Sequence, residues 1–229
     1  MKSKMQFFIA LVSSVSLFVS CNNDSSTTST EDSTQSSTTQ SNGMDTMSTM
    51  TTDTMSHDNM NSGIMSSMKS SMQKMQGMNM TGDFDVDFAN MMVEHHQGAL
   101  DMAQMEISQG KDEKMKSMAQ KISSDQKKEQ QELRDFLSGF KPSDMKHGEG
   151  ELKKSMSSAM DQMKSMQMSG DTDKDFATMM MQHHEHGVAM AKMEVEHGMS
   201  SKLKGMAQKS ITKQNQEIKE FKNWLDSKN

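Results

Sequence analysis

Apolar residues recur at helical spacing along the part of the chain that follows residue 84. Phe88, Met92, His95, Ala99 and Met102 are separated by four, three, four and three positions, which places them on one face of a helix. Later segments repeat this spacing, and they lack the apolar–polar alternation of a half-buried strand. The pattern therefore predicts an all-helical fold.

The pattern occurs twice, at a constant offset of 88 residues, so that His95-His96 recurs as His183-His184. Each copy predicts a short helix followed by two long helices, with glycine at the breaks between them. We predict these helices at 64–79, 85–109 and 112–138 in the first repeat, and at 153–168, 173–197 and 200–227 in the second.

The long helices carry apolar stripes that two helices alone cannot cover. Four such helices bury their stripes most simply by packing together, with the two short helices added beside them. We therefore predict an all-α, four-helix bundle with two extra short helices. Residues 64–141 and 152–229 form its two repeats, and 64–229 is one domain.

The N-terminus has the features of an export signal. Lys2 and Lys4 precede a mostly apolar run over Phe7–Val19 that is too short to span a bilayer, which predicts a signal peptide over residues 1–20. Leu17-Phe18-Val19-Ser20-Cys21 resembles a bacterial lipobox, in which the cysteine is lipidated. This predicts a membrane-anchored lipoprotein of the cell envelope, on the periplasmic or outer-surface side. Secretory cleavage that leaves Cys21 as a free thiol is the alternative.

Residues 21–63 are rich in Ser, Thr, Asn and Asp and show no apolar periodicity, which predicts a disordered tether. Methionine is unusually frequent, with 32 in 229 residues against no Tyr and one Trp. Met44, Met47 and Met50 lie in the tether, where no core has to be filled, so packing does not account for them. Drift within a low-complexity sequence is the other explanation.

The formal net charge is −6 and no basic stripe is present, which argues against nucleic acid as a partner. An acidic surface is compatible with gathering cations.

Histidine and methionine share the inward face of the second helix in both repeats, with Met one turn before each His-His pair and Met about two turns after it. This recurrence favours metal ligands, although a core histidine held by a carboxylate is the alternative. The predicted ligands are His95, His96, Met91, Met92, Met102 and Met105 in the first repeat, and His183, His184, His186, Met179, Met180, Met190, Met193 and His197 in the second.

The short helices carry methionine at three-residue spacing, so their thioethers can converge on one soft ion. These residues are Met72, Met75 and Met78, and Met160, Met163 and Met166. An ordinary apolar stripe explains the spacing equally well.

Ligand softness indicates which metal these residues would bind. Thioethers suit Cu(I) and Ag(I), and imidazole suits copper in either oxidation state. Zinc sites prefer Cys, His and carboxylate, and calcium and magnesium prefer oxygen. Met with His and without Cys therefore predicts copper.

Two polar residues interrupt the apolar stripe of the last helix in each repeat: Gln126 and Glu129, which recur as Gln214 and Glu217. Buried polar side chains need partners. We expect these four to support the opposing histidines by hydrogen bonds, with direct ligation through oxygen as the alternative.

The chain resembles the bacterial family called domain of unknown function 305. The residues that carry this likeness are Phe88, Met91-Met92, His95-His96-Gln97-Gly98-Ala99 and Met102-Ala103, with Gln126-x-x-Glu129. The likeness covers about 65–227. It implies a ferritin-like helical bundle, export and, for some members, periplasmic copper binding linked to copper tolerance. His183-His184-Glu185-His186-Gly187 departs from the usual continuation of the motif.

We therefore expect an exported copper-binding protein, not an enzyme, that sequesters or transfers Cu(I), Cu(II) or Ag(I) and has an unknown delivery partner. One alternative is a di-iron or di-manganese oxidase, which needs four helix carboxylates and two Glu-x-x-His pairs. Only Glu194-x-x-His197 fits that pattern. Another alternative is a structural surface lipoprotein.

Overall fold

The computed structural model describes residues 57–141 and 149–228, and this part of the chain forms helices without strands. The predicted all-α class, built from two helical repeats, is confirmed. The predicted signal peptide, Cys21 and most of the predicted tether lie outside the described residues. The helices are α1 (His57–Gln76), α2 (Phe84–Gln109), α3 (Glu113–Gly139), α4 (Glu149–Lys164), α5 (Thr172–His197) and α6 (Ser201–Asp226).

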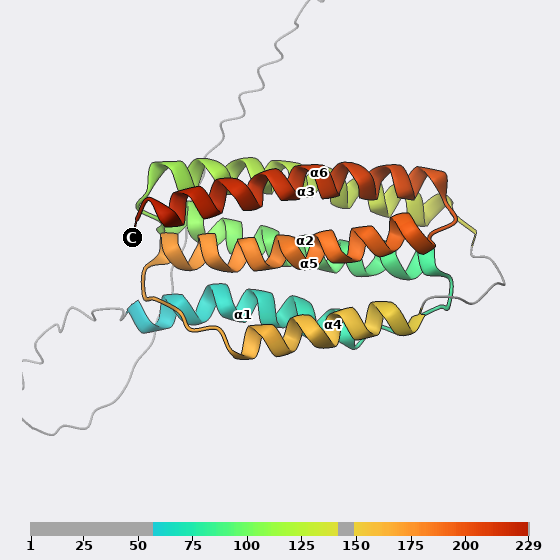
Figure 1. Ribbon diagram of the computed structural model, residues 1–229, viewed down its shortest axis with the longest axis horizontal. Coiled ribbons are helices and arrows are strands. Elements are labelled where there is room, and N and C mark those ends of the chain that lie inside the picture. The colour runs from blue at the N-terminus through green and yellow to red at the C-terminus, as the bar shows by residue number, and fades with distance from the viewer. Residues whose placement is uncertain (1–56, 142–148, 229) are drawn as a thin grey trace, which may run out of the picture. The chain divides into compact units, whose positions relative to one another are not determined.

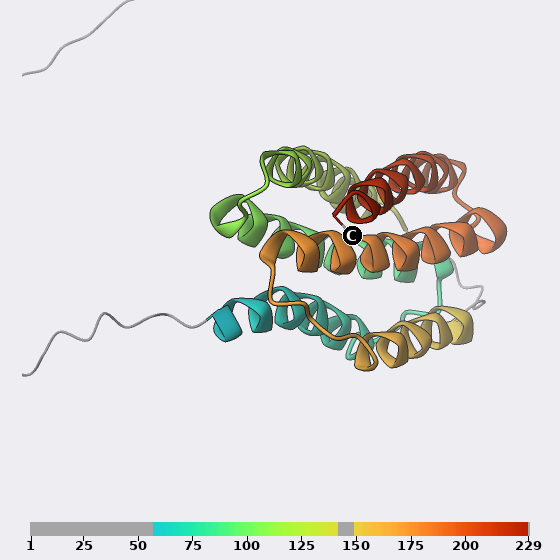
Figure 2. The same cartoon turned by 60° about the vertical axis from the view of Figure 1, so that its left-hand side comes forward.

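The helices form three layers, and each layer takes one helix from each repeat. Figures 1 and 2 show α3 with α6, α2 with α5, and α1 with α4, the α2–α5 layer lying between the other two. The middle helices are therefore covered on both sides. Because α2 and α5 carry the His-His pairs, these histidines lie deep in the interior.

The long helices begin at side chains that accept hydrogen bonds from backbone N–H groups of the first turn, which otherwise lack partners. These N-cap residues are Asp83, Asp112, Asp171 and Ser200. Gly82 and Gly170 lie in the turns before α2 and α5 with φ of 88° and 91°, in the left-handed region that favours glycine. Both turns were expected at these glycines.

The short helices differ from their predicted ranges. α1 begins at His57, inside the segment assigned to the tether. Its first turn is polar and shows no apolar periodicity, so the sequence pattern did not reveal it. α1 ends at Gln76 and α4 at Lys164. Met78, Met80, Met166 and Met168 therefore follow the helices, and the prediction that Met78 and Met166 share a helical face with the preceding methionines is wrong.

Methionine fills much of the core. Met91, Met102, Met115 and Met179 are among its largest fully buried side chains, together with Phe84, Phe88, Phe176 and Phe221. Within residues 57–141 and 149–228, no helix is both long and apolar enough to cross a membrane.

Candidate metal centre

The centre of the molecule is a stacked pair of histidines where α2 meets α5. The rings of His95 and His183 have centroids 3.7 Å apart and planes 27° apart. His95 donates from Nε2 to the backbone oxygen of His183 at 3.1 Å, and His183 donates from Nε2 to the backbone oxygen of His95 at 2.9 Å. These reciprocal bonds join the two repeats through the same atoms of equivalent residues.

Two glycines make room for this pair. A Cβ at Gly187 would lie 2.8 Å from Cε1 of His95, and one at Gly98 would lie 2.8 Å from Cβ of Ser71. Real Cβ atoms do not approach so closely, so larger residues would force the helices apart. The glycines therefore allow α2, α5 and α1 to approach closely around the histidines.

The second histidine of each pair faces the α3–α6 layer and meets a glutamate there. His96 Nε2 lies 3.1 Å from Glu129 Oε2. His184 Nε2 lies 3.0 Å from Glu217 Oε2, although this contact is less well aligned as a hydrogen bond. The predicted hydrogen bond to a histidine is therefore present at Glu129, and Glu217 makes an ion-pair contact with its histidine.

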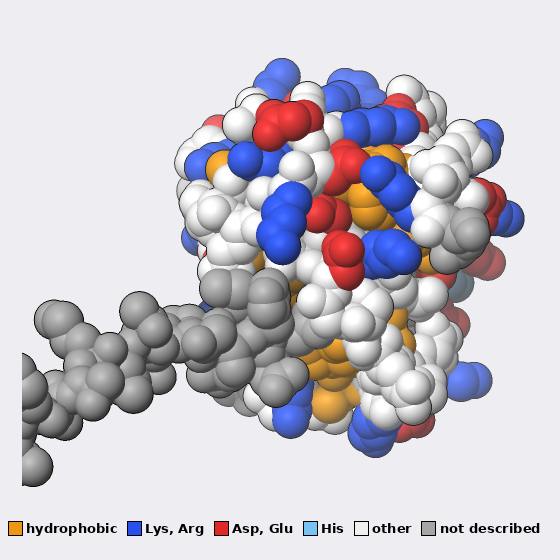
Figure 3. Space-filling model, turned by 90° about the vertical axis from the view of Figure 1, so that its left-hand side faces the viewer, with side chains coloured by type: hydrophobic (Ala, Val, Ile, Leu, Met, Phe, Trp, Pro, Cys, Tyr) orange, Lys and Arg blue, Asp and Glu red, His pale blue; other side chains and the backbone are white. Residues whose placement is uncertain are grey.

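Lysines complete an ion-pair chain along the seam between α3 and α6. Lys213 contacts Glu129 at 2.8 Å, and Lys121 contacts Glu217 at 2.8 Å. Asp125 accepts from both lysines, at 3.0 Å and 3.2 Å. Figure 3 shows charged side chains gathered over the part of the surface that these two helices form, with hydrophobic side chains between them.

These contacts determine which nitrogen of each histidine is available. Carbonyl and carboxylate oxygens only accept, so Nε2 carries the hydrogen in His95, His96 and His183. The lone pair of the neutral ring is then on Nδ1. The Nδ1 atoms of these three rings are buried and have no hydrogen-bond partner within the described part of the protein, and the same holds for both ring nitrogens of His184 and of His186.

Burial keeps the central rings neutral. It lowers the pKa of His95 and of His183 well below the usual value, and neighbouring histidines lower both pKa values further. Burial also lowers the pKa of His186 to about 4. Neutral imidazole is the form that binds metal ions.

Methionine thioethers surround a cavity on the opposite side of α2, toward the α1–α4 layer. The cavity has a volume of about 160 Å³. Its thioethers come from α1 and the segment after it, from α2 and from α4: Met75, Met78, Met80, Met91 and Met156. Gln76 and Lys153 complete its lining.

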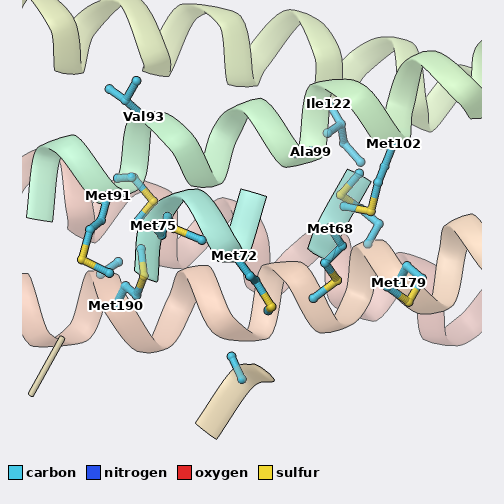
Figure 4. Close-up of a cluster of buried hydrophobic side chains, with 14 of the residues drawn as sticks. Met68, Met72, Met75, Met91, Val93, Ala99, Met102, Ile122, Met179 and Met190 are labelled. Carbon is cyan, nitrogen blue, oxygen red and sulfur yellow. The ribbon is translucent and has the colours of Figure 1, made fainter. Parts of the chain in front are cut away.

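Methionines of both repeats line this interior in a related way. Figure 4 shows Met75, Met91 and Met190 toward one end, Met68, Met102 and Met179 toward the other, and Met72 between them. Met91 and Met102 of α2 correspond to Met179 and Met190 of α5 at the repeat offset. The thioethers are thus distributed over the same interior from both repeats.

A larger groove of about 700 Å³ runs between α1, α4 and α5. His186 reaches it from α5, and His197 lies at it with Nε2 2.8 Å from Glu151 Oε2. The methionines of the groove are Met68, Met72, Met163, Met166 and Met193. Among the described residues, no three His, Cys, Asp or Glu side chains are arranged to hold a metal ion. A metal bound here would need thioether ligands as well.

The family described as Domain of unknown function (DUF305) matches residues 20–137 and again residues 85–225. The chain belongs to the DUF305 family. Its two overlapping matches agree with the tandem repeat.

Two solved structures are similar to this DUF305 chain. A DUF305 fragment from Deinococcus radiodurans has 20% identity and a TM-score of 0.48, over 63% of this chain and 96% of the fragment. A structure described as CopM in the Cu(I)-bound form has 26% identity and a TM-score of 0.48, over 62% of this chain and 96% of its own. None of the curated proteins compared with the chain matches it. The function proposed below rests on the chain's own residues.

The metal ligands that the sequence predicted for this DUF305 chain lie in several different parts of the structure. One group is buried next to the two His-His pairs or in the core around them: Met91, Met92, Met102, Met179, Met180 and Met190. Met72, Met75 and Met163 are buried on the short helices. Met105 is half-buried close to Gly63, and Met160 is half-buried on α4.

Other predicted roles are divided or changed. Glu194 and His197 do not act together, because Glu194 is fully buried beside Asp85 while His197 contacts Glu151. The glutamines do not bond to the histidines. Gln214 donates to Ser210 at 2.8 Å, and Oε1 of Gln126 is buried without a partner within the described residues.

Sequence reasoning also missed several residues of this region. Met156 lines the thioether cavity, and the lysines of the ion-pair chain hold the glutamates. Met156 recurs as Met68 at the repeat offset, so the same self-comparison that found the histidines also contains this signal.

Proposed function

We propose that this DUF305 chain binds copper, chiefly as Cu(I), and sequesters it or passes it on. The observation that carries the proposal is the set of buried Nδ1 atoms of His95, His96, His183 and His184, which lack partners among the described residues. Leaving a buried polar atom unpaired is costly, and such atoms in native proteins call for an explanation. A soft metal ion would give these lone pairs a partner.

The neighbouring thioethers decide which ion fits. Met91 and Met92 precede His95 and His96 by four residues, so they lie on the same faces of α2. Helical side chains lean toward the N-terminus, which brings each imidazole over the preceding methionine. Neutral nitrogen and sulfur donors match Cu(I) and Ag(I), and the imidazoles also accept Cu(II).

The thioether cavity would hold Cu(I) without any histidine. Met75, Met91 and Met156 reach it from three different helices, and Met78 and Met80 from the segment after α1. Neutral thioethers do not offset the charge of a divalent ion, so this cavity favours a monovalent one. No cysteine is among the residues that line this cavity, so its lining lacks the thiolate ligands that zinc prefers.

The remaining parts of the proposal concern place and role. We propose that lipid on Cys21 holds the protein at the cell envelope, on the periplasmic or outer-surface side, and that copper binding there contributes to copper tolerance. In this role the protein binds and releases metal, and it catalyses no reaction.

Anaerobic titration of the full chain with Cu(I), against a coloured competing chelator, tests the proposal. A triple variant removes three thioethers from the cavity and keeps the apolar volume; its changes are Met75→Leu, Met91→Leu and Met156→Leu. We expect this variant to bind fewer Cu(I) ions than the wild type. Met115→Leu in the α3 core is the matched control and should bind as the wild type does.

Four other results would each point elsewhere. Equal Cu(I) binding by the cavity variant and the control would show that these methionines only fill space. Zinc binding as tight as Cu(I) binding would refute the argument from ligand softness. Protein purified with iron or manganese would favour an oxidase, and protein that binds none of these metals would favour a structural lipoprotein.

A further inference from the structure

A cavity on the α3–α6 side leads to one histidine of the first repeat. It has a volume of about 210 Å³ and reaches His96 between α3 and α6, past Glu129, Leu133, Ser210 and Lys213. A water molecule occupies roughly 30 Å³ of liquid, so several waters or one small solute fit into it. His96 lies at the inner end of this cavity and is 1% exposed in total.

The equivalent place in the second repeat is filled by larger side chains. Ile122 replaces Ser210, and Phe221 replaces Leu133, at the repeat offset of 88. Ile122 is 1% exposed and Phe221 is fully buried, with its ring 6.1 Å from that of His184. Two substitutions from smaller to larger residues therefore close over His184.

The exposure of the two supporting glutamates follows the same difference. The side chain of Glu129 is 22% exposed, whereas that of Glu217 is 4% exposed. Each glutamate lies within 3.1 Å of a histidine and 2.8 Å of a lysine, so the difference in exposure comes from the side chains around them.

The geometry points to unequal access: we infer that the α3–α6 cavity is the route by which copper and small chelators reach His96, while His184 is closed to them. The two repeats would then exchange copper at different rates. This inference rests on the proposed copper function for its meaning, but the difference in access does not depend on copper.

The walls of the cavity indicate which solutes it admits. Three acidic and three basic side chains line the cavity, so their charges balance and neither anionic nor cationic solutes are excluded. They are Asp125, Glu129 and Glu132, and Lys128, Lys209 and Lys213. Size is then the main restriction. Small imidazole or thiol donors would enter, whereas a protein side chain presented on a rigid surface would not reach His96.

Hydrogen exchange at the imidazole C2 position, followed by mass spectrometry on the metal-free full chain, tests access directly. We expect His96 to exchange faster than His184 in the wild type. Ser210→Ile fills the cavity and should slow the exchange of His96 without changing that of His184. Ser210→Ala removes the same hydroxyl, which accepts from Gln214, but leaves the cavity open and should exchange as the wild type does.

The reciprocal change is Ile122→Ser, which should speed the exchange of His184 alone. Ile122→Val is a milder second variant in case the first loses its helical circular dichroism. An exchange rate of His96 that is the same in Ser210→Ile and Ser210→Ala would overturn the inference.

Removal of Cu(I) by a small thiol such as penicillamine connects access to function. We expect a fast and a slow phase in the wild type, and a fast phase slowed about tenfold or more in Ser210→Ile, a change of about 1.4 kcal/mol in barrier. Copper that leaves in one phase unaffected by Ser210→Ile would refute the inference and spare the proposed function. A chain that takes up no copper, yet keeps faster exchange at His96, would refute the proposed function and spare the difference in access.

Discussion

Replacing Glu106 with glutamine is expected to make the protein less sensitive to alkaline pH. Glu106 is fully buried near the end of α2, and burial, with the hydrogen bond and charge of Asp173 added, raises its pKa to about 8. Asp173 in turn accepts from the backbone N–H of Lys111 and of Asp112 in the turn before α3, at 2.9 Å each. The proton of Glu106 therefore allows two carboxyl groups to share one buried place.

The second repeat contains the same arrangement. Burial and Asp85 raise the pKa of Glu194 to about 9, and Asp85 accepts from the backbone N–H of Met199 and of Ser200. Gly110 and Gly198 follow the two helices with φ of −62° and −59°, outside the left-handed region. Glycine is needed there because a Cβ would overlap the carboxyl group of Glu106 or Glu194.

The direction of the pH effect follows from the two pKa values. A glutamate has an ordinary pKa of 4.5, so between that value and about 8 the folded protein holds a proton on Glu106 that the unfolded chain has released. The free energy of unfolding falls as pH rises through this window, by at most about 1.4 kcal/mol per pH unit for each group. The full shift would correspond to several kcal/mol, and because charged groups in proteins are partly screened we expect about 2 kcal/mol from each site.

Urea unfolding at about pH 5 and about pH 9 measures the effect. Wild type should lose stability between the two, and Glu106→Gln combined with Glu194→Gln should lose less, since the amide donates to the aspartate at every pH. Glu113→Gln, on a side chain that is 90% exposed, is the control. The same loss of stability in the double variant and in wild type would refute this account of the buried pairs.

Two further predictions concern the histidine centre. Gly187→Ala should destabilise the protein by about 1–3 kcal/mol in urea, because its Cβ would lie 2.5 Å from Gln214 Oε1 and 2.8 Å from His95 Cε1. Gly205→Ala has nothing within 4 Å of the new Cβ and should stabilise by up to about 1 kcal/mol, and equal effects of the two changes would contradict the close packing around Gly187. Burial alone would raise the pKa of Glu129, but the hydrogen bond and charge of His96, with those of Lys213, lower it to about 2. The ionised Glu129 therefore adds to the free energy of unfolding above about pH 4.5, and this contribution is lost as pH falls toward 2. On acidification Glu129→Gln should lose about 2 kcal/mol less free energy of unfolding than wild type does. Equal losses in the two proteins would count against the His96–Glu129 pair.

The long helices were predictable because two independent signals agreed. Apolar spacing and the repeat offset each placed α2, α3, α5 and α6, and all their ends lie within one residue of the predicted positions. The inward direction of the histidines followed from the same spacing, since Phe88 and Met102 share the face of His95.

The partners of the buried residues were less predictable. Periodicity tells which face of a helix is buried and says nothing of the helix that covers it, so the stacking of His95 on His183 was not foreseen. The predicted ranges of the short helices were wrong at both ends. α1 and α4 begin and end earlier than predicted, and α1 ends before Gly77 although methionines continue at regular spacing. The buried pairs Glu106–Asp173 and Glu194–Asp85 were missed because their members lie in different repeats.

The difference between the repeats was visible in the sequence only in part. The sequence shows His186 as a predicted metal ligand of the second repeat, where the first repeat has Gly98 at the offset of 88. The sequence does not reveal the effect of having Ile122 in the first repeat where the second has Ser210. This effect depends on the space around His96, which no spacing rule describes.

X-ray absorption at the copper edge of the Cu(I)-loaded full chain tests the central claim most directly. Copper at the thioether cavity and at the histidine Nδ1 atoms predicts a spectrum that contains both sulfur and nitrogen neighbours, with the sulfur signal reduced when Met75, Met91 and Met156 are changed to leucine. A spectrum with only nitrogen or oxygen neighbours, the same in wild type and variant, would contradict it.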